Sequence, residues 1–349
     1  MTPKISVLIP LYNRKQYAAD CINSVLNQSF TDFELVIRDD FSTDGVFEFV
    51  SENFSDRRIK LFKNEKNLGE AQNLNLLLKA AEGKYFTILH NDDLYLPNAL
   101  KDLFETAEKF GADVVHSSQV LISAKDTVIK KGVPLRKISF DNYPASKAEI
   151  VSNEPILRFN EWFEGRIFRD LQYNIFNRKF FIDNKIFSGA ASENLLILSL
   201  NWIINAKILV KTPLPFYIRR ENSTSQSAAK NISDGEFENE LSKRIEIFRK
   251  LDKFISNFEL FRDNAKLQYK IKARIFGSYE NLNFDKSRSY GNENFAEFYN
   301  LIENTFRKYF GDDAIYLAMM YHWAHLMHFN QNQFQDTLQN CLKILGKNI

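Results

Sequence analysis

The first 116 residues alternate between short apolar runs and segments of helical periodicity, and this alternation limits the fold more than any other feature. Apolar runs at residues 5–9, 33–37 and 85–89 predict buried strands. Between the first two runs, residues 17–26 place apolar side chains at helical spacing. This rhythm predicts a Rossmann-like α/β fold, with a mostly parallel sheet and helices on both faces.

The other elements of this half follow the same rhythm. Leu74, Leu77 and Leu78 indicate a further helix, for which Gly83 is the expected stop. Pro97 is expected to open a helix, because its fixed φ suits the first turn. The remaining expected elements are a helix at 46–54 and strands at 59–62 and 114–115.

Polar residues follow three of these strands, at the edge where parallel sheets bind ligands. After the first strand, Tyr12 can stack on a flat base. After the second, Asp39 can accept a hydrogen bond from a base N–H or a ribose hydroxyl. Helix capping is the alternative role for both Asp39 and Asp44, and it suits Asp44 better.

The third strand end reads His90-Asn91-Asp92-Asp93 and is the most informative. Adjacent carboxylates at the end of a buried strand are costly to desolvate unless a positive charge lies beside them. Mg²⁺ is usually held by one or two carboxylates together with substrate phosphates. The sequence therefore predicts an enzyme that acts on a nucleotide-activated substrate.

Composition narrows the class of protein. The net charge of +2 argues against a nucleic-acid partner. Cys21 and Cys341 give no disulfide framework and fit a reducing cytosol. We find no signal-peptide pattern and no apolar run near the ~20 residues that span a bilayer. We therefore expect a cytoplasmic protein, with peripheral contact at the inner face of the cell membrane left open.

The length of 349 residues suggests two domains, or one domain with an appendage. A polar stretch from Ser223 to Gly235 is the expected boundary, and the sequence beyond it has mostly helical periodicity. The expected domains are 1–230, with halves at 1–116 and 117–230, and a helical C-terminal region at 231–349.

Four ordered blocks, residues 5–14, 33–45, 67–69 and 85–97, together resemble a family 2 glycosyltransferase of the GT-A fold. The resemblance covers about residues 4–225. It implies transfer of a sugar from a nucleotide diphosphate donor to an acceptor hydroxyl, with inversion at the anomeric carbon. It favours a UDP-sugar donor, an Mn²⁺ or Mg²⁺ cofactor, a glycan or lipid-linked acceptor, and a role in bacterial surface polysaccharide synthesis.

The same resemblance assigns residues to the donor site. Pro10, Tyr12 and Asp39 are expected at the uracil and ribose, with Asn67 near the base. The Asp-x-Asp motif of the family falls on His90-Asn91-Asp92, which makes Asp92 the expected metal ligand. The remaining residues that we assign to donor binding are Arg14, His90, Asn91 and Arg220.

Two positions depart from the family pattern. His90 replaces an acid, and it can bind ribose, ligate Mn²⁺ in preference to Mg²⁺, or be a tolerated variation. On the acceptor side, Ser192-Glu193-Asn194 stands where the family has a Glu-Asp pair. Because Asn194 cannot act as a general base, Glu193 is the expected catalytic base. Its alternative role is that of an ordinary acidic residue at a helix start.

Two further groups are candidates for the site. Residues 217–223 resemble the closing loop of the family, where Arg220 or Arg219 would neutralise charge on the departing diphosphate. Trp162 and Phe163, with Arg166 and Arg169, are a candidate sugar-stacking wall for the acceptor.

Other functions fit less well. A nucleotidylyltransferase would favour a glycine-rich loop after the first strand, and residues 10–14 contain no glycine. A glycosyltransferase-like binding or scaffold subunit with weak or no activity is the main alternative, supported by His90 and Asn194. The aromatic C-terminal helices fit three roles: packing on the catalytic domain, pairing of subunits into a homo-oligomer, or peripheral membrane contact.

Overall fold

The computed structural model describes residues 2–123, 135–139, 146–163, 166–167, 170–187 and 195–220, and in the C-terminal part residues 246, 249–262, 264, 267, 268 and 271. The chain divides into two compact units, residues 1–225 and 226–349. The domain boundary expected at residue 230 stays a prediction.

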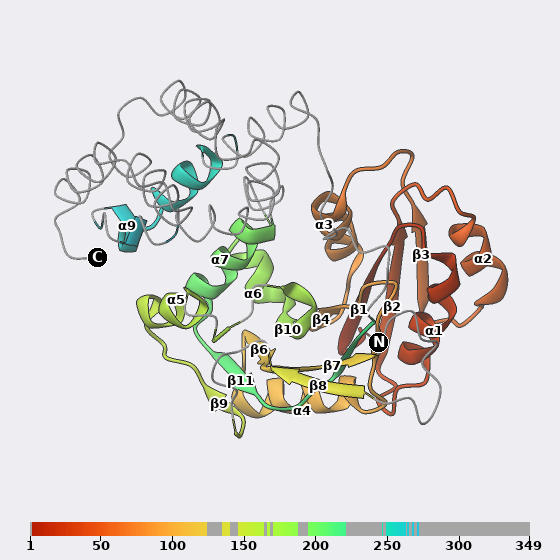
Figure 1. Ribbon diagram of the computed structural model, residues 1–349, viewed down its shortest axis with the longest axis horizontal. Coiled ribbons are helices and arrows are strands. Elements are labelled where there is room, and N and C mark those ends of the chain that lie inside the picture. The colour runs from red at the N-terminus through yellow and green to blue at the C-terminus, as the bar shows by residue number, and fades with distance from the viewer. Residues whose placement is uncertain are drawn as a thin grey trace, which may run out of the picture. The chain divides into compact units, whose positions relative to one another are not determined.

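An eight-stranded sheet forms the centre of the first unit (Figure 1). Strands β10 and β9 run antiparallel to their neighbours, and the other pairings are parallel. In spatial order the strands are β3 (Ile59–Lys63), β2 (Phe33–Asp39), β1 (Ile5–Leu11), β4 (Tyr85–Ile88), β10 (Asn174–Asn177), β6 (Val114–Ser117), β11 (Leu209–Thr212) and β9 (Glu149–Ile150). The predicted mostly parallel sheet is confirmed.

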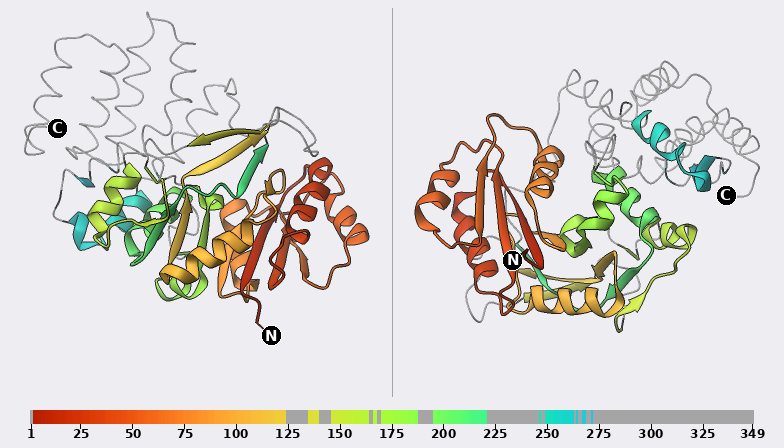
Figure 2. Two further views of the ribbon diagram at one scale, coloured as in Figure 1. Left: turned by 90° about the horizontal axis from the view of Figure 1, so that it is seen from below. Right: turned by 180° about the vertical axis from the view of Figure 1, so that it is seen from behind.

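Helices cover both faces of this sheet. Figures 1 and 2 show α1 and α2 on one face of strands β1–β3 and α3 on the other. The alternation of β1 explains this, because Val7 and Ile9 belong to the core that contains α1 residues. The helices of this unit are α1 (Lys15–Leu26), α2 (Val46–Asn53), α3 (Glu70–Ala80), α4 (Ala99–Phe110), α5 (Pro155–Phe163), α6 (Arg178–Asp183) and α7 (Leu195–Asn205), with the 3₁₀ helix η1 (Leu171–Tyr173).

Aromatic side chains build a second packed region around β10. Phe86 of β4 stacks on Phe176 of β10 at 5.1 Å between ring centroids. Phe181 of α6 and Trp202 of α7 meet Phe176 edge-on, at 4.8 and 5.5 Å. These four rings join β4 and β10 to the helices α6 and α7.

A smaller four-stranded sheet lies beside the large one and carries the end of the first unit. Its strands, in spatial order, are β5 (Leu94–Tyr95), β12 (Tyr217–Arg220), β7 (Gln119–Ser123) and β8 (Leu135–Ser139). Strand β5 directly follows the His90–Asp93 loop in the chain, and β12 pairs with β5, so β12 lies beside that loop. None of these four strands was predicted.

Two predicted boundaries are corrected. Helix α4 begins at Ala99, two residues after Pro97. Helix α3 ends at Ala80 without help from Gly83, since Ala81 is already extended. Gly83 serves a close approach instead: a Cβ there would lie 2.6 Å from the backbone nitrogen of Ser6.

In the second unit the structure describes the short helix α9 (Glu259–Arg262) and a helical stretch at 249–255. Leu251 and Ile255 are both buried there, at helical spacing, in line with the helical periodicity expected of this region. No helix among the described residues combines the length and the apolar character needed to cross a membrane.

Candidate active site

Three loops meet at the carboxyl edge of the large sheet, because β2, β1 and β4 are parallel neighbours. Leu11 is in register with Asp39, so β1 and β2 end at the same level, and β4 ends at the same edge but at Ile88, opposite Leu8, three residues before the end of β1. The residues that follow each strand therefore surround one point, as expected from the sequence.

Asn13 links the three loops by hydrogen bonds. Its backbone N–H donates to Ser42 Oγ at 2.8 Å, and its Oδ1 accepts from the Thr43 N–H at 2.9 Å. Its carbonyl oxygen accepts from Asn91 Nδ2, also at 2.8 Å. The loops after β1, β2 and β4 are thus held as one rim. The Asn91 amide is committed to this link, and its expected contact with the donor stays a prediction.

The rim also contains unusual backbone conformations. Asn13, Arg14 and Phe41 have φ values of 55°, 65° and 64°, in the left-handed region. That region is unfavourable for L-residues by about 1 kcal/mol or more, and such residues concentrate at functional sites. The strain therefore marks the loops after β1 and β2 as a candidate ligand rim.

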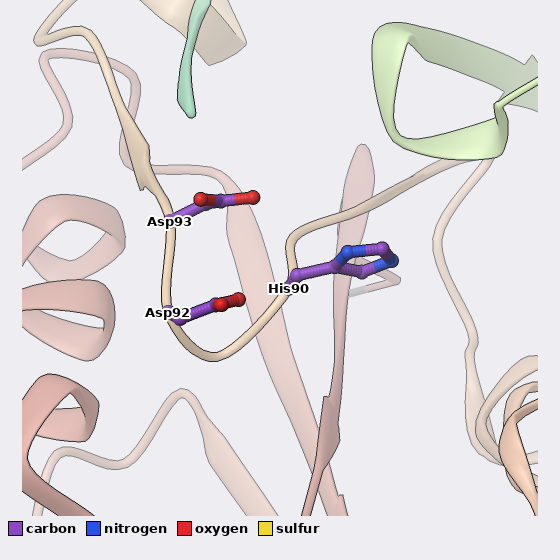
Figure 3. Close-up of side chains that lie close together, drawn as sticks. All are labelled: His90, Asp92 and Asp93. Atoms are coloured by element: carbon purple, nitrogen blue, oxygen red, sulfur yellow. The ribbon is translucent and has the colours of Figure 1, made fainter. Parts of the chain in front are cut away.

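His90, Asp92 and Asp93 form a candidate metal site at this rim. Each offers a ligand atom, and all three atoms lie within 4.8 Å of one another. Figure 3 shows the loop after β4 folding back, so that the two carboxylates project to the same side of it, toward the limb that carries His90. Both carboxylates are buried, with Asp92 7% and Asp93 5% exposed.

Asp93 is held from β12. The Tyr217 hydroxyl donates to its Oδ2 at 2.6 Å, and the Arg220 backbone N–H donates to its Oδ1 at 2.7 Å. Burial and the neighbouring Asp92 raise the pKa of Asp93 to about 6, against the opposing effects of His90 and these two donors. The pair of acids therefore favours a nearby cation.

His90 is paired with Glu70, at the start of α3. Its Nε2 lies 3.4 Å from Glu70 Oε1. Burial lowers the pKa of His90, but Glu70, Asp93 and Asp92 outweigh that effect and raise it to about 9. Burial likewise raises the pKa of Glu70, and His90 reverses the direction to a net decrease. The raised pKa favours a protonated, positively charged His90 beside the two acids. The pairing of His90 with Glu70 was not predicted from the sequence.

The three side chains His90, Asp92 and Asp93 are a suitable ligand set for a divalent cation. Two carboxylates and an imidazole suit Mn²⁺ better than Mg²⁺, which prefers oxygen ligands alone. Imidazole must lose its proton to ligate, so metal binding at His90 would release one. Asp92 already contacts a positive charge, because Arg14 Nη1 forms an ion pair with Asp92 Oδ2.

The two acids at the end of β2 point in different directions. Asp39 is fully buried, and its carboxylate accepts hydrogen bonds from the Ser42 N–H and hydroxyl. Burial raises the pKa of Asp39, against these two donors. Asp40 instead reaches the loop after β3, where it accepts from the N–H groups of Leu68 and Gly69 at 2.8 and 2.9 Å.

Asp40 is a residue that the sequence reasoning missed. Side chains alternate along a strand, so one of two adjacent acids at its end had to turn toward the neighbouring loop. Asp44 behaves as expected of a capping residue: its carboxylate accepts from the N–H of Val46, the first residue of α2, at 3.1 Å. The expected contact of Asp39 with base or ribose stays a prediction.

A family model described as "Glycosyl transferase family 2" matches residues 6–180, half of the chain. The chain belongs to glycosyl transferase family 2. The predicted family is therefore confirmed. The GT-A fold is confirmed as well, by the crystal structure of S. aureus TarS 1-349 in complex with UDP-GlcNAc. That structure superposes with a TM-score of 0.61 at 21% identity, and the match covers 99% of this chain and 92% of that one.

Curated relatives carry glycosyltransferase names. The GalNAc(5)-diNAcBac-PP-undecaprenol beta-1,3-glucosyltransferase of Campylobacter jejuni is 31% identical over 233 residues, 59% of this chain and 74% of that protein. The UDP-Glc:alpha-D-GlcNAc-diphosphoundecaprenol beta-1,3-glucosyltransferase WfgD of Escherichia coli is 31% identical over 137 residues, 39% of this chain and 53% of that protein. An uncharacterized glycosyltransferase of Rickettsia felis is 39% identical, but the match spans only 36% of this chain and 21% of that protein.

Of three further residues that the family resemblance implied for the donor site, Tyr12 lies on the rim, Asn67 on the loop after β3 and Pro10 within β1. The Tyr12 ring is 41% exposed at the end of β1, and so is open to stacking. Asn67 is exposed, and its Oδ1 accepts from the Gly69 N–H at 3.0 Å. Pro10 lies within β1, opposite Arg38 of β2. Their contacts with a donor stay predictions.

The two arginines of the family's closing loop are separated by strand alternation. Arg219 is exposed, whereas the side chain of Arg220 is 1% exposed and packs over the Tyr17 ring at 4.4 Å. Arg220 Nη2 donates to Asp20 Oδ2 at 3.1 Å, while its Nε and Nη1 have no hydrogen-bond partner among the described residues. The Arg220 side chain therefore packs against α1, and its expected contact with diphosphate stays a prediction.

The acceptor side is described in part. Glu193, with Ser192 and Asn194, lies outside the described residues, so the expected catalytic base is untested. The proposed sugar-stacking wall is wrong for Trp162, because this side chain is 1% exposed and packs on Phe159.

Proposed function

We propose that this family 2 protein transfers a sugar from a UDP-sugar to an acceptor hydroxyl, with inversion, in the synthesis of a bacterial surface glycan. The observation that carries the proposal is the His90–Asp92–Asp93 cluster at the rim of a GT-A sheet. Relatives named for UDP-Glc and for undecaprenol-linked acceptors support the donor and acceptor classes. The TarS complex with UDP-GlcNAc shares the fold that would bind such a donor.

Asp92 is the central ligand of the proposed cation, with Asp93 and His90 beside it. When bound, the cation would supply positive charge to the diphosphate as it departs. Tyr217 and the backbone of Arg220 fix the Asp93 carboxylate. Asp93 is therefore preorganised by β12, a strand that lies within the residues that resemble the family's closing loop.

The donor nucleotide would lie along the rim that Asn13 holds together. Tyr12 offers an exposed ring for the base. The buried Asp40 carboxylate orders the Leu68–Gly69 backbone, and this positions Asn67 at the same rim. Asp39, packed against Ser42, shapes the turn after β2.

The acceptor proton requires a base, and Glu193 is the proposed residue. It stands two residues before Leu195, the first residue of α7, in the sequence. The far end of α7 is fixed by the buried Arg158, whose guanidinium donates to the carbonyl oxygens of Ile203 and Ile204 at 2.8 and 2.6 Å. A helix anchored in this way is a firm support for a catalytic residue next to its first turn.

Substitution of Asp92 by Asn tests the function. Transfer from a UDP-sugar panel in the presence of Mn²⁺ should fall by about a hundredfold or more, because a transition-state charge contact is lost. Measured kcat on a lipid-linked or soluble acceptor, together with donor hydrolysis, reports the change. Asp32→Asn, an exposed acid before β2, is the matched control and should keep full activity. Undiminished turnover of folded Asp92→Asn would overturn the assignment.

A binding or scaffold subunit with weak or no activity is the second candidate. The ion pair of Arg14 with Asp92 and the pairing of His90 with Glu70 favour it, since both satisfy the site without a metal. Such a subunit would bind UDP by calorimetry and show neither transfer nor hydrolysis. The helical C-terminal region would then be its docking surface. For either candidate we propose a cytoplasmic location, with peripheral contact at the membrane that carries a lipid-linked acceptor.

A further inference from the structure

We infer that Arg14 is a built-in counter-cation that competes with the divalent metal for Asp92 and, once displaced, becomes available to the diphosphate. This inference rests on the proposed function, because it concerns the same metal and donor site. It predicts that metal and nucleotide bind cooperatively through Arg14, in addition to any direct bridge between them.

The first support is the ion pair itself. Arg14 Nη1 contacts Asp92 Oδ2, on the carboxylate that the family motif assigns to the metal. The other cations beside the acids are directed elsewhere: His90 faces Glu70, and the Arg220 guanidinium faces Asp20. Arg14 therefore provides positive charge at the carboxylate that the proposed metal would also need.

The second support is the backbone that aims Arg14. Two successive left-handed residues, Asn13 and Arg14, turn the chain between β1 and α1. Three hydrogen bonds of Asn13, to Ser42, Thr43 and Asn91, hold this unfavourable turn in place. A conformation that is strained and cross-linked in this way fixes where the Arg14 side chain begins.

The third support is that the pair can open. The side chain of Arg14 is 25% exposed and the side chain of Asp92, taken without its backbone, is 10% exposed, so the guanidinium borders solvent. Both oxygens of Asp93 already accept a hydrogen bond from β12, so this carboxylate is a weaker partner than Asp92 for the Arg14 guanidinium. A displaced Arg14 would thus turn to the open rim, where a guanidinium binds phosphate oxygens well.

The test compares Arg14→Met with a matched control, Lys15→Met, in the full chain. Lys15 has the same charge and is adjacent, but its ammonium lies over the Phe49 ring at 5.6 Å. The dissociation constant of Mn²⁺ alone is measured by electron paramagnetic resonance. It should fall about tenfold in Arg14→Met, the change expected from losing one charge-assisted competitor. It should stay within about twofold in Lys15→Met, whose charge is exposed.

The second readout is cooperativity. The affinity of UDP at saturating Mn²⁺ should weaken in Arg14→Met, so that the gain in Mn²⁺ affinity on adding UDP becomes smaller than in the wild type. Thermal melting in EDTA should fall for Arg14→Met and recover with Mn²⁺. Arg14→Gln is the second variant if Met disturbs folding. Mn²⁺ affinity that is unchanged or weaker in both variants would overturn the inference. If the wild-type protein itself does not bind UDP in the presence of Mn²⁺, the proposed function is overturned instead.

Discussion

Glu34 in β2 is a buried carboxylate with two donors on one oxygen and the Lys60 ammonium beside the other. It accepts from the Ser6 hydroxyl at 2.5 Å and from the Glu82 N–H at 2.6 Å, and Lys60 Nζ lies 2.7 Å away. Burial raises its pKa, but these three partners outweigh burial and lower it from the usual value. Ser6 also accepts from the Gly83 N–H, so Glu34 ties three segments together.

Glu34→Gln should therefore show pH-dependent destabilisation. A carboxyl group with a lowered pKa in the folded state contributes stability above its unfolded pKa, and loses it as pH falls through the folded value. We expect a deficit in unfolding free energy of about 2 kcal/mol at pH 7, shrinking toward zero below pH 4. Urea denaturation of both proteins between pH 7 and pH 3 measures it. A deficit that stays constant over this range would contradict the expectation.

At the scale of single residues, the sequence identified the acidic loop but not the residues that bond to it. The adjacent pair of acids at 92–93 predicted a cation, and the family resemblance implied Asp92 as its ligand; both signals are local in the chain. The partners of the loop, Glu70 and Tyr217, come from distant segments, so no spacing reveals them. The choice between Asp39 and Asp40 needed the direction of each side chain at a strand end, which periodicity alone does not give.

Between elements, the backbone at Gly83 passes close to β1. A Cβ at Gly83 would lie 2.6 Å from the Ser6 nitrogen and 2.8 Å from the Ile5 carbonyl carbon. By contrast, Gly111 has a φ of 59° and open space where its Cβ would be. The two glycines thus serve different purposes, one steric and one conformational.

Gly83→Ala should be the more damaging of the two alanine substitutions. It forces backbone atoms of β1 to move, and we expect it to destabilise by about 3 kcal/mol. Gly111→Ala places Ala in the left-handed region and should lower stability by about 1 kcal/mol. Thermal and urea unfolding of both variants checks the order. Equal effects would mean that β1 yields easily near Ser6.

Elements were predictable where the chain is locally regular. Strands β1 to β4 were recognised as short apolar runs, and helices α1 to α4 mainly by apolar side chains at helical spacing. Strands β9, β11 and β12 have two to four residues each, too few to establish a period. Their positions depend on pairing with distant strands, such as that of β12 with β5.

For the whole molecule, the first compact unit contains the sheet, the strand-end rim and the acidic cluster. A chain ending after Ser225 should therefore fold by itself, with a single cooperative melting transition. Its affinities for Mn²⁺ and UDP should match those of the full chain within about twofold, because every described residue of the proposed donor site is retained. Calorimetric titration of both proteins measures this. A truncated chain that is unfolded would show that residues 226–349 are required for the fold.

The placement of β10 has a consequence for synthesis on the ribosome. This strand inserts between β4 and β6, yet β4 ends at Ile88 and β10 begins only at Asn174. While the intervening segment is being translated, one edge of β4 and its Phe86 ring lack their permanent neighbours. An emerging chain with a bare strand edge is prone to associate with other polypeptides. Chaperone protection during elongation thus matters most between the translation of β4 and that of β10.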